Sequence, residues 1–400
     1  MRLALFALLL APLAQAADKL NVSTSHELPI ARPNETITVA WTDVNKALPG
    51  AMIQRIAVKD SAGRVLPHQV TNIAPLVKDP HKAGAAYGEL IFQYSYAAGE
   101  KKASFTVEKT DTLAPVFPSQ ASGRYVQERL DDFAWENDKI AHRTYGTALG
   151  APAAPGSGKE VLASSGIDVW FKRVPYPIVD RWYNKGHDHY HVDQGEGMDM
   201  YNVGKSRGCG GTGVWDGATL YTSHNYAGWK VLASGPVRAI FELSYDSWDA
   251  GGTKVTEVKR FTVDAGHYLD QIDSTFSFAG RPQLTVAVGL NKTPTDKGQS
   301  PTITRTVSES GKWQVQWVEQ AKNGAFGTAI VMPTTSGFAE DPLNHLVLAP
   351  ATSGKALRYL AGAAWSLSGE ITSSEQWQAY VAAAAQRLNH PVNVTIVEKK

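Results

Sequence analysis

The sequence predicts an all-β protein with a small N-terminal β-sandwich, a large antiparallel supersandwich and one C-terminal helix. Many short runs alternate apolar and polar residues, and Gly, Pro or Asn separate them. In the second half of the chain, ten or more such runs follow one another without a helical pattern between them. Only one stretch near the C-terminus has helical composition, and 400 residues suit two or three domains.

The first sixteen residues, MRLALFALLLAPLAQA, predict a cleaved signal peptide. Arg2 precedes an apolar run, and Ala14-Gln15-Ala16 is a small-x-small cleavage pattern, so cleavage is expected after Ala16. This predicts a periplasmic or secreted protein. The run is too short to cross a bilayer, and no later stretch is long enough, so no membrane span is expected.

Composition excludes several function classes. The net charge of +1 provides no field that would attract nucleic acid. The single cysteine, Cys209, excludes an internal disulfide and, with the signal peptide, indicates a bacterial exported protein. It lies among glycines without an obvious base, so we expect a packed, inert thiol.

Residues 17–112 predict the N-terminal sandwich. Alternating strands are expected at 35–41, 54–60, 88–96 and 103–109, with turns such as Pro49-Gly50 between them. A Pro/Ser/Gly-rich stretch, LAPVFPSQASG, follows and predicts a linker over residues 113–125.

Residues 126–400 predict the large domain. Its strands are expected near 126–147, 165–174, 236–248, 253–264, 267–278, 283–291, 313–320, 327–332, 345–350, 358–367 and 392–397. For the helix, Ser373 is the expected N-cap and Gln376 completes a capping box. Asn389 and Pro391 end it.

The segment NKGHDHYHVDQGEGMDMYNVGKSRGCGGTG (184–213) is rich in titratable groups and glycine. On a strand His187, His189 and His191 would share a face, which is one route to a site for a divalent cation such as zinc or calcium. The alternative is a long irregular loop, and such loops in compact domains are usually functional. We expect a binding or active site here without a cofactor, with metal ligation by the histidines as the alternative.

Two further polar stretches flank a predicted cleft. FAWENDKIAHRTYG (133–146) is a strand without a clean apolar face, and SSGIDVWFKRVPYPIVDRWY (164–183) mixes aromatic and cationic residues as a groove for an acidic sugar would. The predicted substrate-binding residues are Glu136, Asn137, Arg143, Lys172, Tyr201 and Lys205.

Two reactions fit this inventory. Glycoside hydrolysis could draw on carboxylates among Glu136, Asp138, Asp193, Glu196 and Asp199. β-Elimination from a uronic acid needs a base, an acid and a cation beside the substrate carboxylate. The numerous His, Tyr and Arg side chains favour elimination.

In the elimination hypothesis His189 or Tyr190 is the base and His191 the acid, because histidine titrates near neutral pH. Arg207 and Lys205 hold the carboxylate, since arginine binds a carboxylate through two parallel hydrogen bonds. The predicted partner is an acidic oligosaccharide.

The chain resembles a bacterial exported family known as a domain of unknown function (DUF4861). The resemblance lies in the residues and the order of four segments: WENDKIAHRTYG, SSGIDVWFKRVPYP, GEGMDMYNVGKSRGCGG and SGPVRAIFEL. The resemblance covers residues 20–397. It implies a galactose-mutarotase-like supersandwich after a smaller β-domain, a link to polysaccharide-utilisation gene clusters, and a dehydratase acting on the uronate ends of oligosaccharides.

The function predicted from the sequence is therefore a carbohydrate lyase or dehydratase acting on uronic-acid-containing oligosaccharides. The alternatives are a glycoside hydrolase on the same substrates and a non-catalytic glycan-binding protein of the cell envelope. In the latter, aromatic rings would stack on glycans and the histidines would pack or bind a divalent cation.

Overall fold

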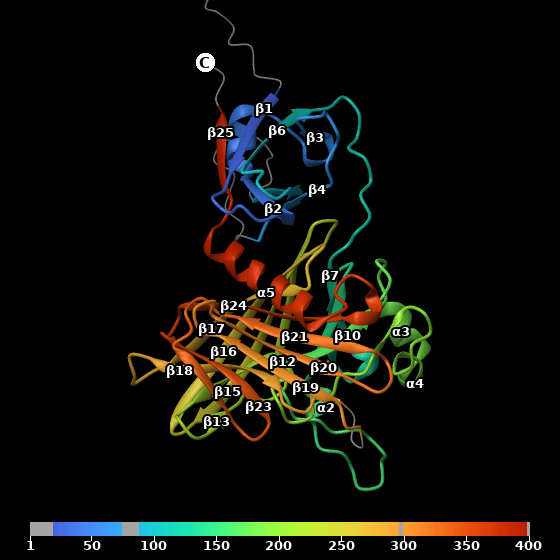
Figure 1. The fold of residues 1–400 in the computed structure, drawn as a ribbon, viewed down its shortest axis with the longest axis vertical. Coiled ribbons are helices and arrows are strands. Elements are labelled where there is room, and N and C mark those ends of the chain that lie inside the picture. Colours follow the sequence, from blue (N-terminus) through green and yellow to red (C-terminus); the bar gives the residue numbers. More distant parts are fainter. Residues whose placement is uncertain (1–18, 74–87, 296–298, 398–400) are drawn as a thin grey trace, which may run out of the picture.

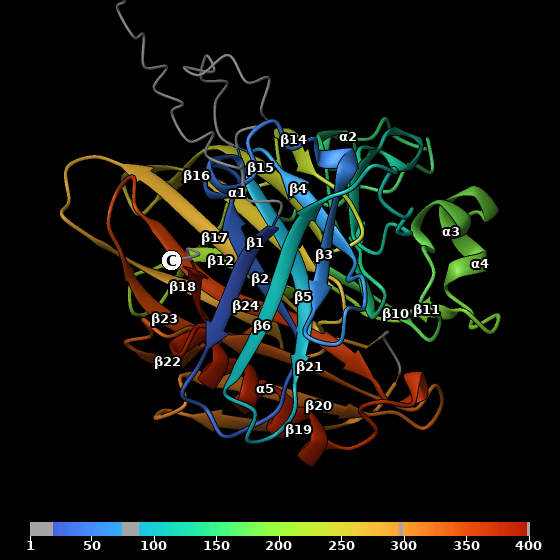
Figure 2. The ribbon, with the colours of Figure 1, turned by 90° about the horizontal axis from the view of Figure 1, so that it is seen from above.

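The computed structural model describes residues 19–73, 88–295 and 299–397, and it confirms the predicted all-β architecture. A small β-sandwich stands on a larger one, and helix α5 (Ser374–Asn389) lies at the junction (Figure 1). Seen from above, the small sandwich covers part of the large one (Figure 2). The predicted signal peptide, residues 1–16, lies outside the described residues. None of the helices in the described ranges has the length and apolar character needed to span a membrane.

The N-terminal sandwich consists of two antiparallel sheets. One has the order β25-β1-β6-β3 and the other β2-β5-β4. The strands are β1 (Lys19–Ser25), β2 (Arg32–Ala40), β3 (Ile56–Asp60), β4 (His68–Thr71), β5 (Glu89–Tyr96), β6 (Lys102–Lys109) and β25 (Asn393–Val397). Helix α1 (Trp41–Ala47) and a 3₁₀ turn (Ile53–Arg55) join β2 to β3, and Trp41 and Val44 of α1 enter the core between the sheets.

The C-terminal strand belongs to the N-terminal sandwich. β25 pairs antiparallel with β1, from Asn393 opposite Ser25 to Val397 opposite Asn21. The sequence assigned all of 126–400 to the large domain, because an alternating run does not identify its partner strand. The predicted linker also differs, since β7 begins at Ser122 and Ala121 already bridges to Gly235.

The large domain contains three antiparallel sheets. Eight strands in the order β14-β15-β16-β17-β24-β21-β20-β19 form the first, and the others have the orders β13-β12-β18-β23-β22 and β11-β10-β9-β8-β7. The eight-stranded sheet comprises β14 (Gly228–Ala233), β15 (Arg238–Ala250), β16 (Thr253–Asp264), β17 (Leu269–Phe278), β19 (Thr302–Ser308), β20 (Trp313–Glu319), β21 (Ala325–Val331) and β24 (Ala356–Trp365). The second sheet comprises β12 (Cys209–Trp215), β13 (Leu220–Tyr221), β18 (Leu284–Asn291), β22 (Gly337–Glu340) and β23 (Asn344–Ala351). The third comprises β7 (Ser122–Val126), β8 (Asp132–Glu136), β9 (Ile140–Thr144), β10 (Asp168–Lys172) and β11 (Gly197–Asp199).

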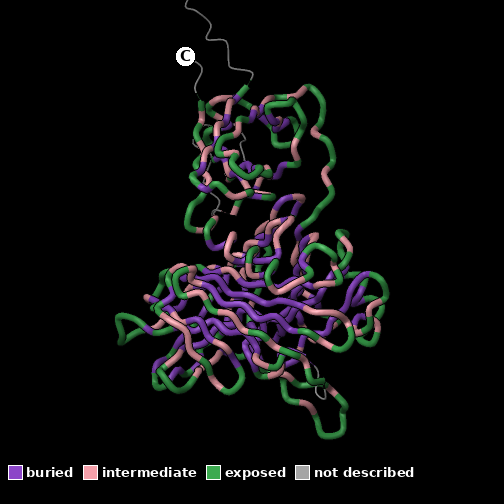
Figure 3. Tube along the Cα trace, viewed as in Figure 1, coloured by how far each residue is buried: buried purple, intermediate pink, exposed green. Residues whose placement is uncertain are grey.

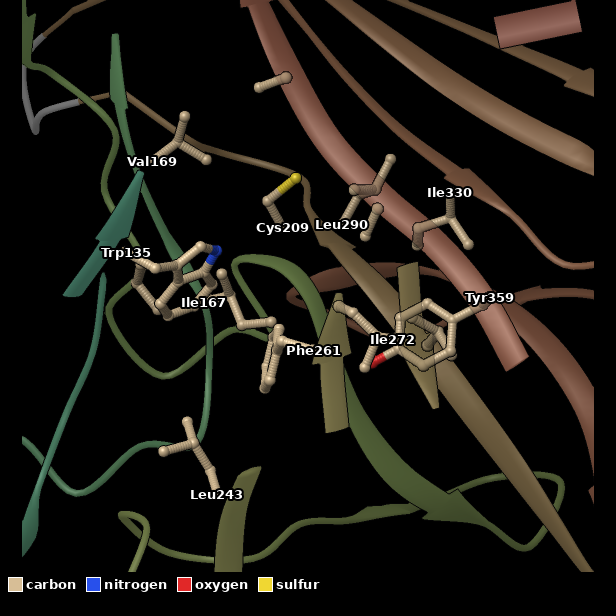
Figure 4. Packing of buried hydrophobic residues seen from close by; sticks show 14 of the residues in the cluster. Trp135, Ile167, Val169, Cys209, Leu243, Phe261, Ile272, Leu290, Ile330 and Tyr359 are labelled. Atoms are coloured by element: carbon tan, nitrogen blue, oxygen red, sulfur yellow. The ribbon is translucent and has the colours of Figure 1, made fainter. Parts of the chain in front are cut away.

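One apolar core joins the three sheets. β16 alternates buried and accessible residues along most of its length, as a strand with one covered face should. Buried segments run through the middle of the large domain (Figure 3). Cys209 lies in this core near Leu290 (Figure 4), and its thiol donates to the carbonyl oxygen of Gly362 at 3.3 Å. Burial raises the pKa of the thiol to about 12, which agrees with the inert cysteine expected from the sequence.

Helix α5 covers the other face of the eight-stranded sheet. Trp377 and Val381 pack against residues of β20 and β21. Ser373 is the N-cap as predicted, because its hydroxyl accepts from the backbone N–H of Gln376 at 3.3 Å. The Gln376 side chain accepts instead from Thr372, one residue before the cap.

Two short helices cover the outer face of the third sheet. They are α3 (Val179–Lys185) and α4 (His187–Tyr190), and both views place them at one margin of the molecule (Figures 1 and 2). Trp182, Tyr183 and Tyr190 pack there against Trp170 of β10. The remaining short elements are α2 (Thr147–Gly150) and 3₁₀ turns at Gln127–Arg129 and Ser366–Ser368.

The segment 184–213 is therefore not one long irregular loop. It contains the end of α3, all of α4 and β11, and the first residues of β12. β12 reads CGGTGVW and is almost entirely buried, so its glycines serve close packing. A Cβ on Gly211, for example, would lie 2.6 Å from the carbonyl oxygen of Arg207.

Candidate functional site

Four adjacent strands of the third sheet place charged residues on the face that α3 and α4 cover. Asp132 lies on β8, Arg143 on β9, Asp168 on β10 and Asp199 on β11, and the exposed fraction of each is 6% or less. Arg143 and Asp168 are direct cross-strand partners, so the register of β9 and β10 brings them together. We call these four residues the Arg143 cluster.

A single guanidinium connects the three carboxylates of the cluster. Arg143 Nε donates to Asp168 Oδ2 at 2.7 Å, and Nη2 donates to Asp199 Oδ2 at 2.8 Å. Nη1 lies 3.6 Å from Asp132 Oδ2. The guanidinium carbon is 5.2 Å from the ring centre of Trp170. Three carboxylates thus share one buried cation.

Phenols complete the hydrogen bonding of the cluster. The hydroxyl of Tyr145 donates to Asp168 Oδ2, and that of Tyr183 donates to Asp132 Oδ2, each at 3.0 Å. Burial, reinforced by the neighbouring carboxylates, raises the pKa of both phenols well above its ordinary value. They remain protonated donors at neutral pH.

The carboxyl groups of Asp199 and Asp132 retain protons more readily than ordinary aspartates. Burial and the negative charge of Asp168 raise the pKa of Asp199 well above its usual value, and the charge of Arg143 only partly opposes them. Burial raises the pKa of Asp132 to about 6 against the charges of Arg143 and Arg129. One shared arginine does not compensate three buried carboxylates, so the cluster can store a proton.

His191 connects this buried cluster to solvent. It directly follows α4, and 36% of its side chain is exposed. Its Nδ1 lies 2.8 Å from the carbonyl oxygen of His187, which assigns the proton of the neutral ring to Nδ1. Nε2 then carries the lone pair, 3.4 Å from Asp199 Oδ2. Burial lowers the pKa of His191, so the imidazole is a neutral base at pH 7 with a carboxyl group beside it.

The three predicted histidines do not form a common face. His187 and His191 lie side by side, with ring centres 4.3 Å apart, because they are four residues apart along a helical turn and not two apart on a strand. His189 is half-buried, and within the described ranges no hydrogen bond, ion pair or ring contact joins its side chain to the Arg143 cluster. Across the described ranges, no three His, Cys, Asp or Glu side chains converge as metal ligands.

Among the other predicted catalytic residues, Tyr190 lies at the cluster and Arg207 does not. The ring of Tyr190 is buried against Trp170, and its hydroxyl is 3.5 Å from Arg143 Nη1, so it faces the protein and not solvent. Arg207 is buried between the sheets, where Nη1 donates to Ser165 Oγ at 2.8 Å and to the Thr212 carbonyl oxygen at 3.4 Å. A substrate carboxylate cannot reach it there.

Three predicted sugar-binding residues instead hold the fold together. The carboxylate of Glu136 accepts from the backbone N–H groups of Ile178 and Val179 and from Lys172 Nζ at 2.7 Å, which fixes the start of α3. The amide of Asn137 donates to the carbonyl oxygens of Asp264 and His267. All three side chains are buried, so no polar group remains for a sugar.

The remaining predicted binding residues are apart from the cluster. Tyr201 is 5% exposed, and its hydroxyl is buried without a hydrogen-bond partner in the described ranges. Lys205 is exposed to solvent. Of the six predicted binding residues, Arg143 alone lies in the cluster.

The structure also adds residues that the sequence did not indicate. Arg129 lies beside Asp132 and Tyr190, and its side chain is 15% exposed, with Nη2 bonded to Glu160 at 2.6 Å. Asp132 and Asp168 each begin a buried strand, DFAWE and DVWFK. A charged residue heading an otherwise apolar strand is the signal that could have identified them.

Residues 204–208 read GKSRG and match the G-x-S-x-G pattern of serine hydrolases. Ser206 is 2% exposed, and its hydroxyl donates to the carbonyl oxygen of Val203 at 2.6 Å. The segment is a turn leading into β12 and not a strand-to-helix elbow, so it supplies no exposed nucleophile.

A family model described as "Domain of unknown function (DUF4861)" matches residues 24–394. A protein of Formosa agariphila described as "Uncharacterized protein P7" is 30% identical over 397 residues, which cover 96% of this chain and 94% of that protein.

Two solved structures from Enterococcus faecalis resemble the fold at low identity. The first is an α-mannosidase, with a TM-score of 0.47 and 8% identity over 97% of this chain. The second is a protein of glycosyl hydrolase family 38, with a TM-score of 0.49 and 9% identity over 96% of this chain. The chain spans about half the length of each, 48% and 49%.

Proposed function

We propose that this chain, which belongs to the family described as a domain of unknown function (DUF4861), is a carbohydrate-active lyase or dehydratase acting on uronic-acid-containing oligosaccharides. In the proposed reaction a base removes the proton on the carbon beside the carboxylate. The oxygen substituent on the next carbon leaves and takes up a proton, and a carbon–carbon double bond forms between the two carbons. The signal peptide predicted at residues 1–16 would direct such an enzyme to the cell envelope.

The observation that supports this proposal is the position of His191 between solvent and the Arg143 cluster. Its neutral, half-exposed imidazole has the lone pair of Nε2 next to Asp199, and Asp199 is bonded to Arg143. A proton taken by Nε2 creates a positive ring, and the carboxyl oxygen of Asp199 at 3.4 Å lies where it can accept that proton in a hydrogen bond. The same ring can return the proton to the leaving oxygen, so one histidine serves both steps.

Burial of the carboxylates favours elimination over hydrolysis. A glycosidase needs two carboxyl groups that reach opposite sides of the scissile bond. Asp132, Asp168 and Asp199 are 3% exposed or less and are bonded inside the protein. At this site His191 is thus the titrating group that meets solvent.

The cation for the substrate carboxylate is proposed to be Arg129. It is partly exposed, lies beside Tyr190 and Asp132, and is bonded at its outer end to Glu160, whose side chain is 53% exposed. An exposed ion pair of this kind exchanges readily, so a substrate carboxylate can replace Glu160. Arg129 takes the role that was predicted from the sequence for Arg207 and Lys205.

The test replaces His191 by Gln, which keeps the size and polarity of the side chain but removes the titrating nitrogen. We expect elimination on uronate oligosaccharides to fall about a hundred- to ten-thousand-fold, the usual contribution of a general base. Product formation is followed by the ultraviolet absorbance of the conjugated double bond and by mass spectrometry. His224→Gln is the matched control, because that histidine is exposed and its side chain makes no hydrogen bond, ion pair or ring contact to the cluster in the described ranges.

Three results would contradict the proposal. If His189→Gln abolished activity and His191→Gln kept it, then His189 and not His191 would be the base. New reducing ends without unsaturation would indicate a glycoside hydrolase. Saturable binding of uronate oligosaccharides without any product would indicate a non-catalytic glycan-binding protein.

A further inference from the structure

A cavity of about 360 Å³ lies at the junction of the two domains, remote from α3 and α4. Glu35 and Thr36 of β2 contribute from the N-terminal sandwich, and Thr262 of β16 and Tyr380 of α5 contribute from the large domain. The volume falls in the range of small-molecule sites. Residues of both domains therefore line one cavity that is open to solvent.

Three ion pairs lie at this junction, and within each pair the two charges neutralise each other. Each joins an arginine to a carboxylate through two hydrogen bonds of 2.5–3.1 Å. The pairs are Arg32–Glu35, Arg238–Asp264 and Arg358–Asp273.

Arg238 and Arg358 of these pairs line the cavity, and the third arginine of its wall has no such partner. Arg387, in the last turn of α5, donates from Nη1 to the Pro33 carbonyl oxygen at 3.1 Å and has no carboxylate within ion-pair distance in the described part of the chain. His267 adds no second charge, because burial and the positive charge of Arg387 lower the pKa of its ring. The cavity thus contains one uncompensated positive charge.

The wall near Arg387 is apolar. Leu360 of β24 and Ala384 and Leu388 of α5 line the cavity, together with Leu269. An inorganic anion would leave this surface uncovered in water, whereas an organic anion would cover it. In an organic ligand of about the size of a sugar, one carboxylate would match the positive charge of Arg387 and the carbon skeleton would cover the apolar wall.

We infer that the interdomain cavity binds a monoanionic organic carboxylate of about hexose size, with Arg387 as the group that holds the carboxylate. The site is separate from His191 and does not depend on the proposed elimination reaction. Since its walls come from both domains, the bound ligand also ties the N-terminal sandwich to the supersandwich.

The experiment is calorimetric titration of the full chain with glucuronate, which carries one carboxylate on a hexose-sized ring. Arg387→Gln should weaken the affinity about tenfold or more, because a charge-assisted pair is lost. Arg281→Gln, which removes an exposed charge in the turn before β18, should bind as the wild type does. Circular dichroism and thermal unfolding verify that each variant is folded.

A second variant tests the cavity without changing its charge. Thr262→Trp adds bulk to a half-buried position in the wall and should abolish glucuronate binding. Glucose, which lacks the carboxylate, should bind at least about tenfold more weakly than glucuronate. His191→Gln should bind glucuronate normally even if it abolishes catalysis, which separates the two proposals.

The inference is overturned if glucuronate does not bind the wild type at millimolar concentration, or if Arg387→Gln and Thr262→Trp both bind it unchanged. Equal affinity for glucose would remove the role of the carboxylate. Equal affinity for inorganic sulfate would show a simple anion site and remove the role of the apolar wall.

Discussion

Arg143 and Arg207 are both almost completely buried, yet their surroundings differ in charge. Burial opposes the charge of Arg143, but the carboxylates of Asp199 and Asp168 raise its pKa well above the ordinary value. Arg207 has a serine hydroxyl and a backbone carbonyl as partners, and burial lowers its pKa to about 10. Because His191 beside Arg143 reaches solvent and Arg207 has no such neighbour among the described residues, we propose the functional site at Arg143 and not at Arg207.

The largest effect expected from this difference is that of Arg143→Met. The substitution leaves Asp168 and Asp199 buried without their cation, which costs about 3–5 kcal/mol of unfolding free energy. Urea unfolding at pH 7 measures the loss.

Arg207→Met is the matched variant for this comparison. It removes a desolvated charge that has no carboxylate partner within the described residues, and its unfolding free energy should change by less than about 1.5 kcal/mol. Equal losses in the two variants would show that burial and not the charge of the partners determines the contribution of these arginines.

Asp132→Asn tests the excess of negative charge at Arg143. The pKa of Asp132 rises from an ordinary 3.8 to about 6 on folding, so between these values the folded state binds more protons than the unfolded state. This contribution to stability is complete below about pH 4 and is lost as the pH rises through about 6. The difference in unfolding free energy, wild type minus Asp132→Asn, should fall by about 3 kcal/mol across that window.

Chemical denaturation at half-unit steps of pH measures this difference. Asp216→Asn is the control, because that carboxylate is exposed and its pKa is lowered by backbone N–H groups. A wild-type advantage that grows with pH would mean that Arg143 and Arg129 outweigh burial at Asp132.

Local pattern predicted the strands but not the contacts that create the site. β15, β16 and β17 alternate clearly, so 236–248, 253–264 and 267–278 were predicted within a few residues. β12 was missed because CGGTGVW contains little apolar surface, although neighbouring sheets bury it. The pairing of Asp168 with Arg143 depends on cross-strand register between segments 25 residues apart. The choice of His191 over His189 depends on one helical turn, which three alternating histidines do not reveal.

Ser165→Ala tests the neutral partners of Arg207. Ser165 Oγ accepts from Arg207 Nη1 and from the hydroxyl of Ser223, both at 2.8 Å. Its removal leaves two buried donors without an acceptor, which should cost about 1.5 kcal/mol of unfolding free energy. If water enters to replace the hydroxyl, the cost will be smaller, and a crystal structure of the variant would show that water.

Tyr183→Phe is the counterpart on the Arg143 side, because it removes one donor to Asp132 and leaves a carboxylate less satisfied. A hydrogen bond to a charged group contributes more than a neutral one, so at pH 8 Tyr183→Phe should cost more than Ser165→Ala, about 2 kcal/mol. At pH 4, where Asp132 is protonated in the folded state, the cost of Tyr183→Phe should approach that of an ordinary neutral hydrogen bond. A cost that does not depend on pH would remove the distinction between the charged surroundings of Arg143 and the neutral surroundings of Arg207.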